Sequence, residues 1–418
     1  MRILQINSHH KMIGGTERYY LELSDLLRKR GHLVANFSLK DSKNYSSEWE
    51  KYFLDELDFS KNDYKSFIKK ACRMFYSFEA KRKVERLLDD FKPDIVHIHN
   101  IYYYISPSIL SVIKKRKIPV VQTVHDYQLI SPCLDLFSNG RVNEDTKKNR
   151  YYKAVLSKSI KESYVASLMA AVASYIQHIF RLYERHVDYF IAPSVFMEKK
   201  LIEYGFDPRK IIHLPNFTNF SLSKTSNKPH KEKYVLYFGR LEEKKGAMFL
   251  LDVARSLPKV MFKMIGKYPD EKIKIKIKDF LSEHSIKNVT VLKFQESAEL
   301  QQSITRSLFV LVPSLWYENM PYTILESYAL GKPVVASRIG GISEIVKVGE
   351  NGLLFEAGNL DDCEKKVTSL WENPDQVKRM GVNAKKLVMN RFSPSVHYKN
   401  LTQIYERATE HYSQKGPL

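Results

Sequence analysis

Cysteine is scarce in this chain of 418 residues, which contains only three. Cys72, Cys133 and Cys363 are odd in number and lie far apart in the sequence. They predict neither a disulfide framework nor a CxxC metal knuckle, because both need paired or closely spaced cysteines. We therefore expect the protein to work in a reducing compartment, and we interpret it as cytoplasmic.

The sequence also has little that would target it to a membrane or keep it unfolded. Residues 1–7 have the pattern of a β-strand rather than of a signal peptide, and there is no low-complexity tract. One uncharged stretch, between Glu162 and Arg181, has 18 residues, but its serines, glutamine and histidine make it a poor membrane span. We expect a globular protein of two domains, each of roughly 200 residues.

Acidic residues are too few to balance the basic ones, which leaves a formal net charge of +20. The excess is +11 in residues 1–214 and +9 in residues 215–418, so no single basic tail carries it. Basic surfaces attract nucleic acid, anionic lipid or phosphorylated substrates. The even spread disfavours nucleic acid and favours an anionic membrane. A generally lysine-rich composition is the alternative.

The first half of the chain alternates short apolar runs with helical patterns, as βαβ units do. We predict helices at residues 16–30, 61–92 and 195–204, and strands at residues 3–6, 33–39, 94–99, 120–124 and 189–192. Functional loops are expected at the carboxyl ends of parallel strands. The pairs that fall there are Gly14-Gly15, His99-Asn100, His125-Asp126 and Pro193-Ser194.

A polar stretch at residues 218–232 predicts a linker between the domains. A second alternation follows it, with strands predicted at residues 234–238, 261–265, 289–292, 308–312, 333–336 and 352–355. Residues 272–278 alternate Lys and Ile with the period of a strand. Their place between two strands favours a helix, and a final helix is predicted at residues 394–411.

Two glutamates, Glu318 and Glu326, lie eight residues apart, with Pro321 between them and Gly331 beyond. Proline suits the first turn of a helix and glycine its end, so Glu318 should precede a helix and Glu326 should lie inside it. The N–H groups at residues 319–322 would add donors to the two carboxylates. Such a corner can hold a polyhydroxylated ligand. The alternative is a pair of solvated surface charges.

Two further loops suit a diphosphate. Arg240 and Lys245 follow a predicted strand, so one loop can present both cations to a phosphate pair. Gly14 and Gly15 lie between a strand and a helix, where a phosphate or sugar can approach the backbone. The alternatives are two solvated basic residues and an ordinary tight turn.

The nonapeptide from Glu318 to Glu326 resembles the E-x7-E signature of the retaining family-4 glycosyltransferases. The same resemblance is carried, in the family's order, by Gly14-Gly15-Thr16-Glu17-Arg18, Val124-His125-Asp126, Ala192-Pro193-Ser194, Leu214-Pro215-Asn216, Phe238-Gly239-Arg240-Leu241, Lys244-Lys245-Gly246 and Gly340-Gly341-Ile342-Ser343-Glu344. It covers nearly the whole chain.

The resemblance implies the α/β GT-B fold, with two Rossmann-like parallel-sheet domains facing a central cleft. The first, residues 1–217, would bind the acceptor and carry a helical insertion at about residues 151–187. The second, residues 233–393, would bind the nucleotide-sugar, and residues 394–418 would cross back to the first domain.

Position by position, the resemblance also implies roles for single residues. His125, Arg240, Lys245 and Glu318 would be catalytic. His125 would hydrogen-bond the donor sugar without acting as a general base. Glu318 would hold the donor-sugar hydroxyls and Glu326 the ribose. The implied donor-binding set is Gly14, Gly15, Arg240, Lys245, Glu318, Asn319, Met320, Pro321 and Glu326.

The implied activity is sugar transfer with retention, from a nucleotide-sugar, most simply a UDP- or GDP-sugar, to a glycan or lipid-linked acceptor. No cofactor or metal is expected, because no carboxylate pair such as DxD accompanies the phosphate-binding residues. A role in bacterial cell-surface polysaccharide synthesis, such as lipopolysaccharide or exopolysaccharide, would place the enzyme on the inner face of the plasma membrane.

The predicted insertion has large apolar residues at three- and four-residue steps, which predicts an amphipathic helix. They are Val165, Leu168, Met169, Val172, Ile176, Ile179, Phe180 and Tyr183, and Lys153, Lys158, Lys161, Arg181 and Arg185 flank them. Such a helix can lie on an anionic membrane or pack on the first domain. The sequence leaves both alternatives open.

A sugar-nucleotide epimerase and a basic nucleic-acid-binding protein are the alternative functions. A sugar-nucleotide epimerase shares the GT-B architecture, but it needs carboxylates placed for proton abstraction, and the Arg240, Lys245 and E-x7-E set favours transfer. A basic nucleic-acid-binding protein would gather its charge, with aromatic residues, on one face. No contact with nucleic acid is expected, because the charge is dispersed.

Overall fold

The computed structural model describes residues 1–55, 73–220 and 232–414. These divide into two compact units. Unit 1 consists of Met1–Leu136, Asn143–Asn216 and His397–Leu418, and unit 2 of Phe137–Val142 and Phe217–Val396. Most of the predicted linker and residues 61–72 of a predicted helix lie outside the described residues.

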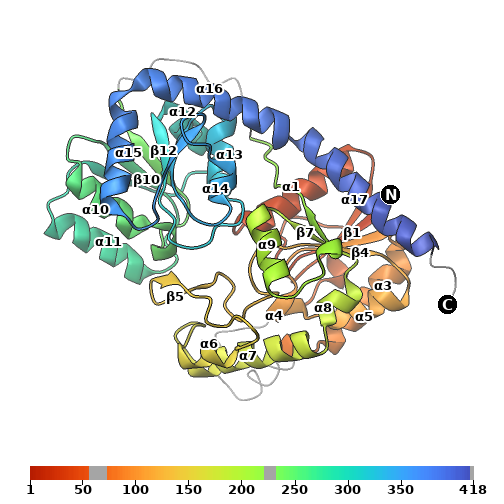
Figure 1. Ribbon diagram of the computed structural model, residues 1–418. Coiled ribbons are helices and arrows are strands. Elements are labelled where there is room, and N and C mark those ends of the chain that lie inside the picture. The colour runs from red at the N-terminus through yellow and green to blue at the C-terminus, as the bar shows by residue number, and fades with distance from the viewer. Residues whose placement is uncertain (56–72, 221–231, 415–418) are drawn as a thin grey trace. The chain divides into compact units, whose positions relative to one another are not determined.

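Unit 1 is built on a six-stranded parallel sheet with the order β2-β1-β3-β4-β7-β8 (Figure 1). Its strands are β1 (Arg2–Ile6), β2 (Leu33–Phe37), β3 (Ile95–Ile98), β4 (Val120–Thr123), β7 (Tyr189–Ala192) and β8 (Ile211–His213). Nearly every residue of these strands is buried, as expected for a parallel sheet covered on both faces. The predicted strands of this half are confirmed to within two residues.

The helices of unit 1 follow the βαβ pattern. They are α1 (Gly15–Lys29), α3 (Phe78–Phe91), α4 (Tyr102–Ile105), α5 (Ser108–Lys115), α6 (Tyr152–Leu156), α7 (Tyr164–Ile179), α8 (Leu182–His186), α9 (Val195–Glu203) and α17 (Pro394–Gln414), with the short 3-10 helices η1 (Glu50–Tyr52) and η2 (Pro208–Lys210). α1 shows why its sequence forms a helix. Glu17 accepts from the backbone N–H of Gly14 in a capping box, and Gly31 follows the helix end at φ +85°.

The C-terminal helix α17 is tied to unit 1 from His397 onward. Its Tyr405 hydroxyl hydrogen-bonds His97 Nδ1 on β3 over 2.7 Å, and His397 hydrogen-bonds both the Tyr19 hydroxyl and the carbonyl of Pro215. Tyr405 and His397 are both buried, so these polar groups are satisfied inside the core.

Unit 2 repeats the architecture with a six-stranded parallel sheet of order β11-β10-β9-β12-β13-β14. Its strands are β9 (Val235–Phe238), β10 (Phe262–Ile265), β11 (Val289–Leu292), β12 (Phe309–Val312), β13 (Val334–Ser337) and β14 (Gly352–Phe355). Its helices are α10 (Ala247–Ser256), α11 (Glu271–Glu283), α12 (Ser297–Arg306), α13 (Tyr322–Ala329), α14 (Ile342–Ile345), α15 (Leu360–Glu372) and α16 (Pro374–Arg391), with η3 (Glu243–Lys245). A small antiparallel hairpin, whose strands β5 (Phe137–Ser138) and β6 (Arg141–Val142) have two residues each, is grouped with this unit.

The alternating Lys–Ile segment is helical, as predicted, and forms part of α11. Asp270 caps the helix by accepting from the backbone N–H of Ile273 over 3.0 Å. The helix buries Ile277 while Ile275 is 55% exposed, so the period-two pattern does not correspond to one buried face.

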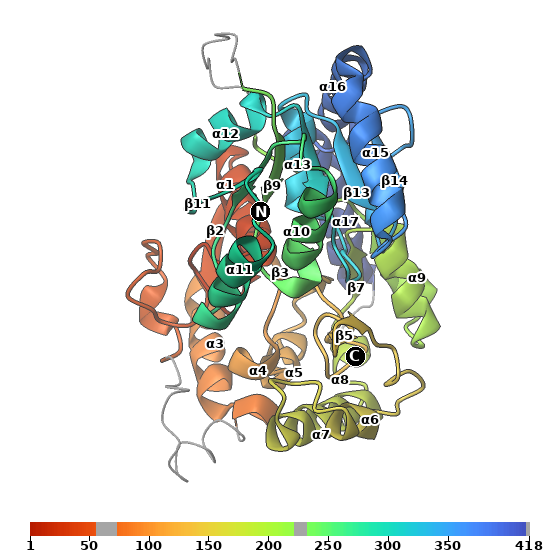
Figure 2. The same ribbon diagram turned by 90° about the vertical axis from the view of Figure 1, so that its left-hand side faces the viewer.

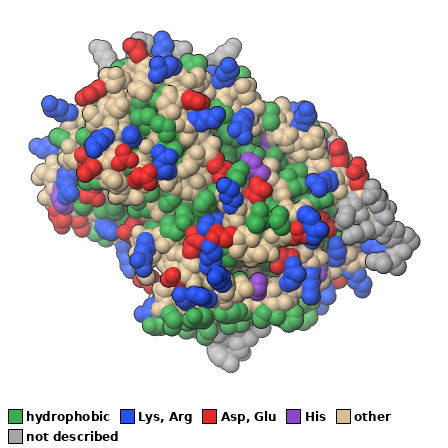
Figure 3. Space-filling view, in the orientation of Figure 1, with side chains coloured by type: hydrophobic (Ala, Val, Ile, Leu, Met, Phe, Trp, Pro, Cys, Tyr) green, Lys and Arg blue, Asp and Glu red, His purple; other side chains and the backbone are tan. Residues whose placement is uncertain are grey.

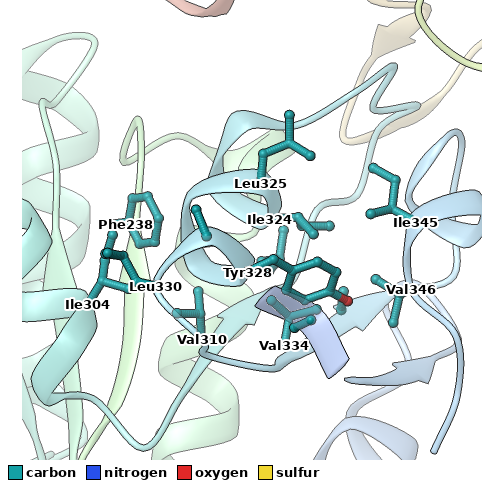
Figure 4. Close-up of a cluster of buried hydrophobic side chains, with 14 of the residues drawn as sticks. Phe238, Ile304, Val310, Ile324, Leu325, Tyr328, Leu330, Val334, Ile345 and Val346 are labelled. Carbon is teal, nitrogen blue, oxygen red and sulfur yellow. The ribbon is translucent and has the colours of Figure 1, made fainter. Parts of the chain in front are cut away.

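The core of unit 2 fixes the helix that carries Glu326. Figure 4 shows Ile324, Leu325 and Tyr328 of α13 in a buried cluster with Val334 of β13 and Val346. These three residues of α13 are fully buried. Burial of this kind stabilises by roughly 1.5–3 kcal/mol for each large side chain, so α13 has little freedom to move.

The predicted apolar helix of the insertion forms, but its packing differs from a simple amphipathic pattern. α7 buries its small residues, which are Ser167, Ala170, Ala171, Ala173 and Ser174. Ala170 and Ala173 pack with Met74, and small side chains let the helix approach its neighbours closely. The large residues Val165, Leu168, Val172 and Ile179 of the predicted stripe are exposed instead.

Among the helices that the structure describes, none combines the length and the apolar character that crossing a bilayer requires. Figure 2 and Figure 1 both show α6 and α7 lying side by side.

Candidate functional site

The candidate site lies at the topological switch point of each sheet. This is the point where successive strands stop being added on one side of the first strand and begin to be added on its other side. In unit 2 the chain passes from β9 to β10 and β11 on one side, then returns to place β12 on the other side of β9. In unit 1 the same reversal lies between β1 and β3. Loops that leave the two strands of such a switch point diverge, and ligands of open α/β sheets bind there. Arg240 and Lys245 follow β9, and Glu318 follows β12.

The loop after β9 is pressed onto the end of β12. Gly246 has φ +78°, and a Cβ built there would lie 1.9 Å from the carbonyl oxygen of Pro313. Leu315 also donates its backbone N–H to the carbonyl of Lys244 over 2.8 Å. Only glycine fits at position 246, and the close approach that it allows brings Lys245 to the loop that carries Glu318.

Lys245 and Glu318 form a short ion pair. Lys245 Nζ lies 2.6 Å from Glu318 Oε1, and the Ser314 hydroxyl donates to the same oxygen over 2.8 Å. Glu318 is only 4% exposed. Burial by itself raises the pKa of Glu318, but the charge and hydrogen bond of Lys245 and the Ser314 hydroxyl outweigh it and hold the pKa below its ordinary value. The carboxylate is therefore ionised at neutral pH, which excludes the solvated-charge interpretation.

A third loop, after β13, fixes the backbone of Glu318. Gly341 donates its N–H to the carbonyl of Glu318 over 2.7 Å. Gly340 has φ +54°, and a Cβ there would lie 2.4 Å from the same carbonyl oxygen. The loops after β9, β12 and β13 thus meet at one buried residue, Glu318.

The second glutamate of the pair is also buried. Glu326 is 3% exposed on α13, and Asn319 and Met320 of the preceding loop are buried as well. α13 begins at Tyr322, with Pro321 as its extended N-cap residue at φ −72° and ψ 123°. The prediction that Pro321 lies in the first turn is therefore wrong by one position, because its ψ is not helical.

Of the two cations predicted to face a phosphate pair, Lys245 contacts Glu318 whereas Arg240 contacts a different acid. Arg240 is half exposed and lies 3.1 Å from Glu242 Oε1. Lys245 Nζ lies 4.8 Å from the centroid of the Trp316 ring, and Lys244 Nζ lies 5.1 Å from it. An aromatic face stabilises an adjacent cation, so Trp316 helps to hold Lys245 in place.

In unit 1, Gly14 and Gly15 begin α1. The backbone N–H of Gly14 donates to Glu17 Oε2 over 3.1 Å. A Cβ at Gly14 would be 3.6 Å from that oxygen, an ordinary contact, so the packing of unit 1 does not itself require glycine at this position.

His125 follows β4 and ends a buried chain of hydrogen bonds. His125 Nε2 lies 3.0 Å from His99 Nδ1, and His99 Nε2 lies 3.0 Å from Gln5 Oε1. Burial lowers the pKa of His125 to about 3, and it also lowers the pKa of His99 well below its ordinary value. Both rings are therefore neutral at pH 7.

This chain of contacts selects one tautomer of His125. Gln5 Oε1 can only accept, so His99 carries its proton on Nε2 and has a lone pair on Nδ1. His125 must then donate from Nε2, which leaves the lone pair on its Nδ1. The buried His99 therefore orients His125.

The pKa of Asp126, next to His125, is shifted in the opposite direction to the pKa of Glu318. It accepts from Asn100 Nδ2 and from the backbone N–H of Gln128, both over 3.0 Å. Burial nevertheless raises the pKa of Asp126 to about 7, while these hydrogen bonds act to lower it. Unit 1 therefore contains a carboxyl group that titrates near neutrality.

Sequence reasoning missed Ser314, Trp316 and Gln5. Ser314 and Trp316 follow β12 by two and four residues, so the rule for strand ends could have found them. Gln5 lies inside β1, and no local signal connects it to His99, 94 residues away. Among the described residues, no three His, Cys, Asp or Glu side chains are grouped so that they could hold a metal ion.

Family models cover most of the chain. The model described as Glycosyltransferase Family 4 matches residues 13–222, and the one described as Glycosyl transferases group 1 matches residues 219–387. An uncharacterized glycosyltransferase of Methanocaldococcus jannaschii is 23% identical over 98% of this chain and 99% of its own length. The amylovoran biosynthesis glycosyltransferase of Erwinia amylovora is 25% identical over 51% of this chain and 55% of its own length.

Solved structures share the fold. The sucrose-phosphate synthase of Thermosynechococcus elongatus superposes with a TM-score of 0.71 at 17% identity, over 97% of this chain and 98% of that one. HepE of Anabaena, solved in complex with UDP-glucose, gives a TM-score of 0.67 at 17% identity, over 97% of this chain and all of that one. At this identity the likeness shows the fold alone, which is the GT-B fold predicted from the sequence.

We predict that Gly340→Ala destabilises unit 2 by about 2 kcal/mol or more, because it adds both left-handed strain and a clash with the Glu318 carbonyl. Gly349→Ala is the matched control, since Gly349 has φ +83° but no atom within 4 Å of a built Cβ. Urea unfolding measures both variants. Equal losses of stability would show that Gly340 does not support Glu318.

We predict that Asp126→Asn stabilises the protein at pH 8 and has little effect near pH 4. The folded-state pKa is raised, so the charged carboxylate costs stability as the pH rises from about 4 to about 7. The linkage is on the order of 4 kcal/mol, enough to raise the midpoint of thermal unfolding by several degrees. A midpoint that falls, or that shifts equally at both pH values, would contradict the raised pKa of Asp126.

We predict that His125 carries its proton on Nε2. Long-range proton–nitrogen spectra of the 15N-histidine-labelled protein report the tautomer, and His125→Gln assigns the signal. Gln5→Leu should release the constraint and give mixed tautomers at His99 and His125. A proton on Nδ1 of His125 in the wild type would refute the hydrogen-bond chain.

Proposed function

The chain belongs to glycosyltransferase family 4, and from this premise we propose that it moves a sugar from a nucleotide-sugar to a glycan or lipid-linked acceptor with retention of anomeric configuration. The observation that carries the proposal is the buried Lys245–Glu318 pair at the switch point of unit 2. The neighbour HepE was solved with UDP-glucose, which supports a UDP-sugar as the first donor to test.

In this proposal, Glu318 and Glu326 contact different parts of the donor. Glu318 is buried, ionised and held by three loops, so it can accept hydrogen bonds from sugar hydroxyls without rearranging. Glu326 lies just over one turn into the rigid helix α13, where a carboxylate can accept both hydroxyls of a ribose. Asn319, Met320 and Pro321 shape the loop between the two.

Cations supply the electrostatic part of the reaction. Breaking the anomeric bond leaves extra negative charge on the diphosphate, and fixed positive charge stabilises it. Lys245 is already positioned by Glu318 and Trp316, and Arg240 lies on the same loop, where its half-exposed guanidinium can exchange Glu242 for a phosphate. We propose that these two residues act without a metal, so chelation with EDTA should leave activity unchanged.

His125 would contribute a hydrogen bond rather than proton transfer. A histidine whose pKa is about 3 is a weak base, since efficient general bases have pKa values near the working pH. Its neutral ring can accept from a sugar hydroxyl at Nδ1 and shield the reacting carbon from water. The departing phosphate oxygen would take the proton of the acceptor, and Gly14 and Gly15 would lie against the donor.

The acceptor and the cellular setting rest on the relatives. One relative is a glycosyltransferase of amylovoran biosynthesis, which supports a role in a bacterial cell-surface polysaccharide. Synthesis of that kind on lipid-linked intermediates would place the enzyme on the cytoplasmic face of the plasma membrane.

We predict that one nucleotide-sugar from a panel of UDP-, GDP- and ADP-sugars raises the thermal unfolding midpoint of the protein and is slowly hydrolysed by it. Glu326→Gln should lose most of the stabilisation, because a neutral amide cannot accept both ribose hydroxyls. The sugar released should keep its anomeric configuration, as followed by proton NMR.

Glu350→Gln is the matched control for this experiment, because Glu350 is an exposed glutamate of the same unit. It should behave as the wild type does. If no nucleotide-sugar stabilises the protein, or if Glu326→Gln and Glu350→Gln respond equally, the proposed donor site is wrong.

A further inference from the structure

Large apolar side chains lie exposed together on α6 and α7 of unit 1. We define the α6–α7 face by Tyr152, Leu156, Tyr164, Val165, Leu168, Val172, Ile179 and Phe180, whose exposed fractions run from 39% to 72%. Figure 3 shows hydrophobic side chains gathered along the lower edge of the view, over these helices. A contiguous apolar surface of this kind marks an interaction site.

The face is a consequence of how α7 packs. Its small residues are turned inward, so the large residues at positions 165, 168, 172 and 179 form one stripe on the opposite side of the helix. A helix that only had to cover unit 1 would bury its large side chains and expose small or polar ones. The reversed order indicates that the large side chains meet a second apolar partner.

Charges around the face are mostly positive. Exposed Lys158 and Lys161 lie at the start of α7, and exposed Arg181 and Arg185 lie just beyond its end. Figure 3 shows Lys and Arg side chains just above the hydrophobic edge. Glu162 is the exposed acid in this stretch, and Glu184, half-buried, lies 3.7 Å from Arg181.

We propose that the α6–α7 face binds the surface of an anionic phospholipid bilayer, with α7 lying in the plane of the interface. Apolar residues would enter the boundary of the acyl chains, while the basic residues at both ends of the helix contact lipid phosphates. Charge at both ends holds the helix parallel to the membrane.

A second copy of this chain fits the face less well. In a two-fold interface the same patch meets itself, so the basic residues at the ends of one α7 would approach those of the other copy. Like charges at an interface weaken association, whereas an anionic bilayer neutralises them. The charge pattern therefore favours lipid over self-association.

This binding goes beyond sugar transfer and can be measured without it, because the face belongs to unit 1 and the Lys245–Glu318 pair to unit 2. The test is sedimentation of the purified full chain with phosphatidylglycerol-containing vesicles and with neutral phosphatidylcholine vesicles. The wild type should bind the anionic vesicles, and salt should weaken the binding.

The double variant Leu168→Gln/Ile179→Gln should lower the partition coefficient about tenfold. Its control is Val382→Gln/Met389→Gln, which changes two residues of α16 that are equally exposed, each at 64%, and it should bind as the wild type does. Lys158→Gln/Lys161→Gln should weaken binding and reduce its dependence on salt. The midpoint of thermal unfolding verifies that each variant is folded.

Three results would overturn the proposal. They are a wild type that stays in the supernatant with anionic vesicles, a Leu168→Gln/Ile179→Gln variant that binds as its control does, and a dimer in sedimentation velocity that this variant abolishes. The last result would assign the face to a second copy of the chain. Donor binding is unaffected by the variant in each case, so a failure here is distinguishable from a failure of the proposed transferase function.

Discussion

The arrangement of unit 2 depends on the ion pair of Lys245 with the buried Glu318, at the carboxyl ends of the two central strands of its sheet. An ionised carboxylate at 4% exposure is costly unless its charge and hydrogen bonds are matched. Close approaches between backbone segments allow these matching interactions to form. Gly246 lets the loop of Lys245 lie against Pro313, and Gly340 lets another loop lie against the Glu318 backbone. The backbone geometry around Glu318 is thus what satisfies the charge and the hydrogen bonds of its carboxylate.

In unit 1, burial keeps ionisable side chains neutral, whereas in unit 2 the buried Glu318 is charged. Its histidines at β3 and β4 are desolvated and neutral, and their hydrogen bonds run in one direction from His125 to Gln5. A neutral ring with a fixed tautomer is suited to orienting a hydroxyl, and it is unsuited to removing a proton at neutral pH. The two units therefore offer complementary chemistry, with fixed charge in unit 2 and fixed neutral dipoles in unit 1.

Much of this could be predicted from the sequence, and the exceptions have physical reasons. Strand patterns and the order of the motifs gave the two parallel sheets, because buried parallel strands are continuous apolar runs. The end of a predicted strand located Lys245, and the helix predicted between Pro321 and Gly331 located Glu318 just before its start. The contact of Gln5 with His99 could not be predicted, since it depends on strand register. The exposed stripe of α7 could not be predicted either, because spacing identifies the apolar residues without showing which face a neighbour covers.

The most direct test of the central claim is the calorimetric affinity of the preferred nucleotide-sugar and of its nucleoside diphosphate for the wild type, Glu318→Gln and Glu326→Gln. Our account predicts that Glu326→Gln weakens both ligands alike, because the ribose is common to them. Glu318→Gln should weaken the nucleotide-sugar and leave the nucleoside diphosphate almost unchanged, because only the sugar would contact Glu318. Equal losses for both ligands in Glu318→Gln, or no loss in either variant, would contradict the account.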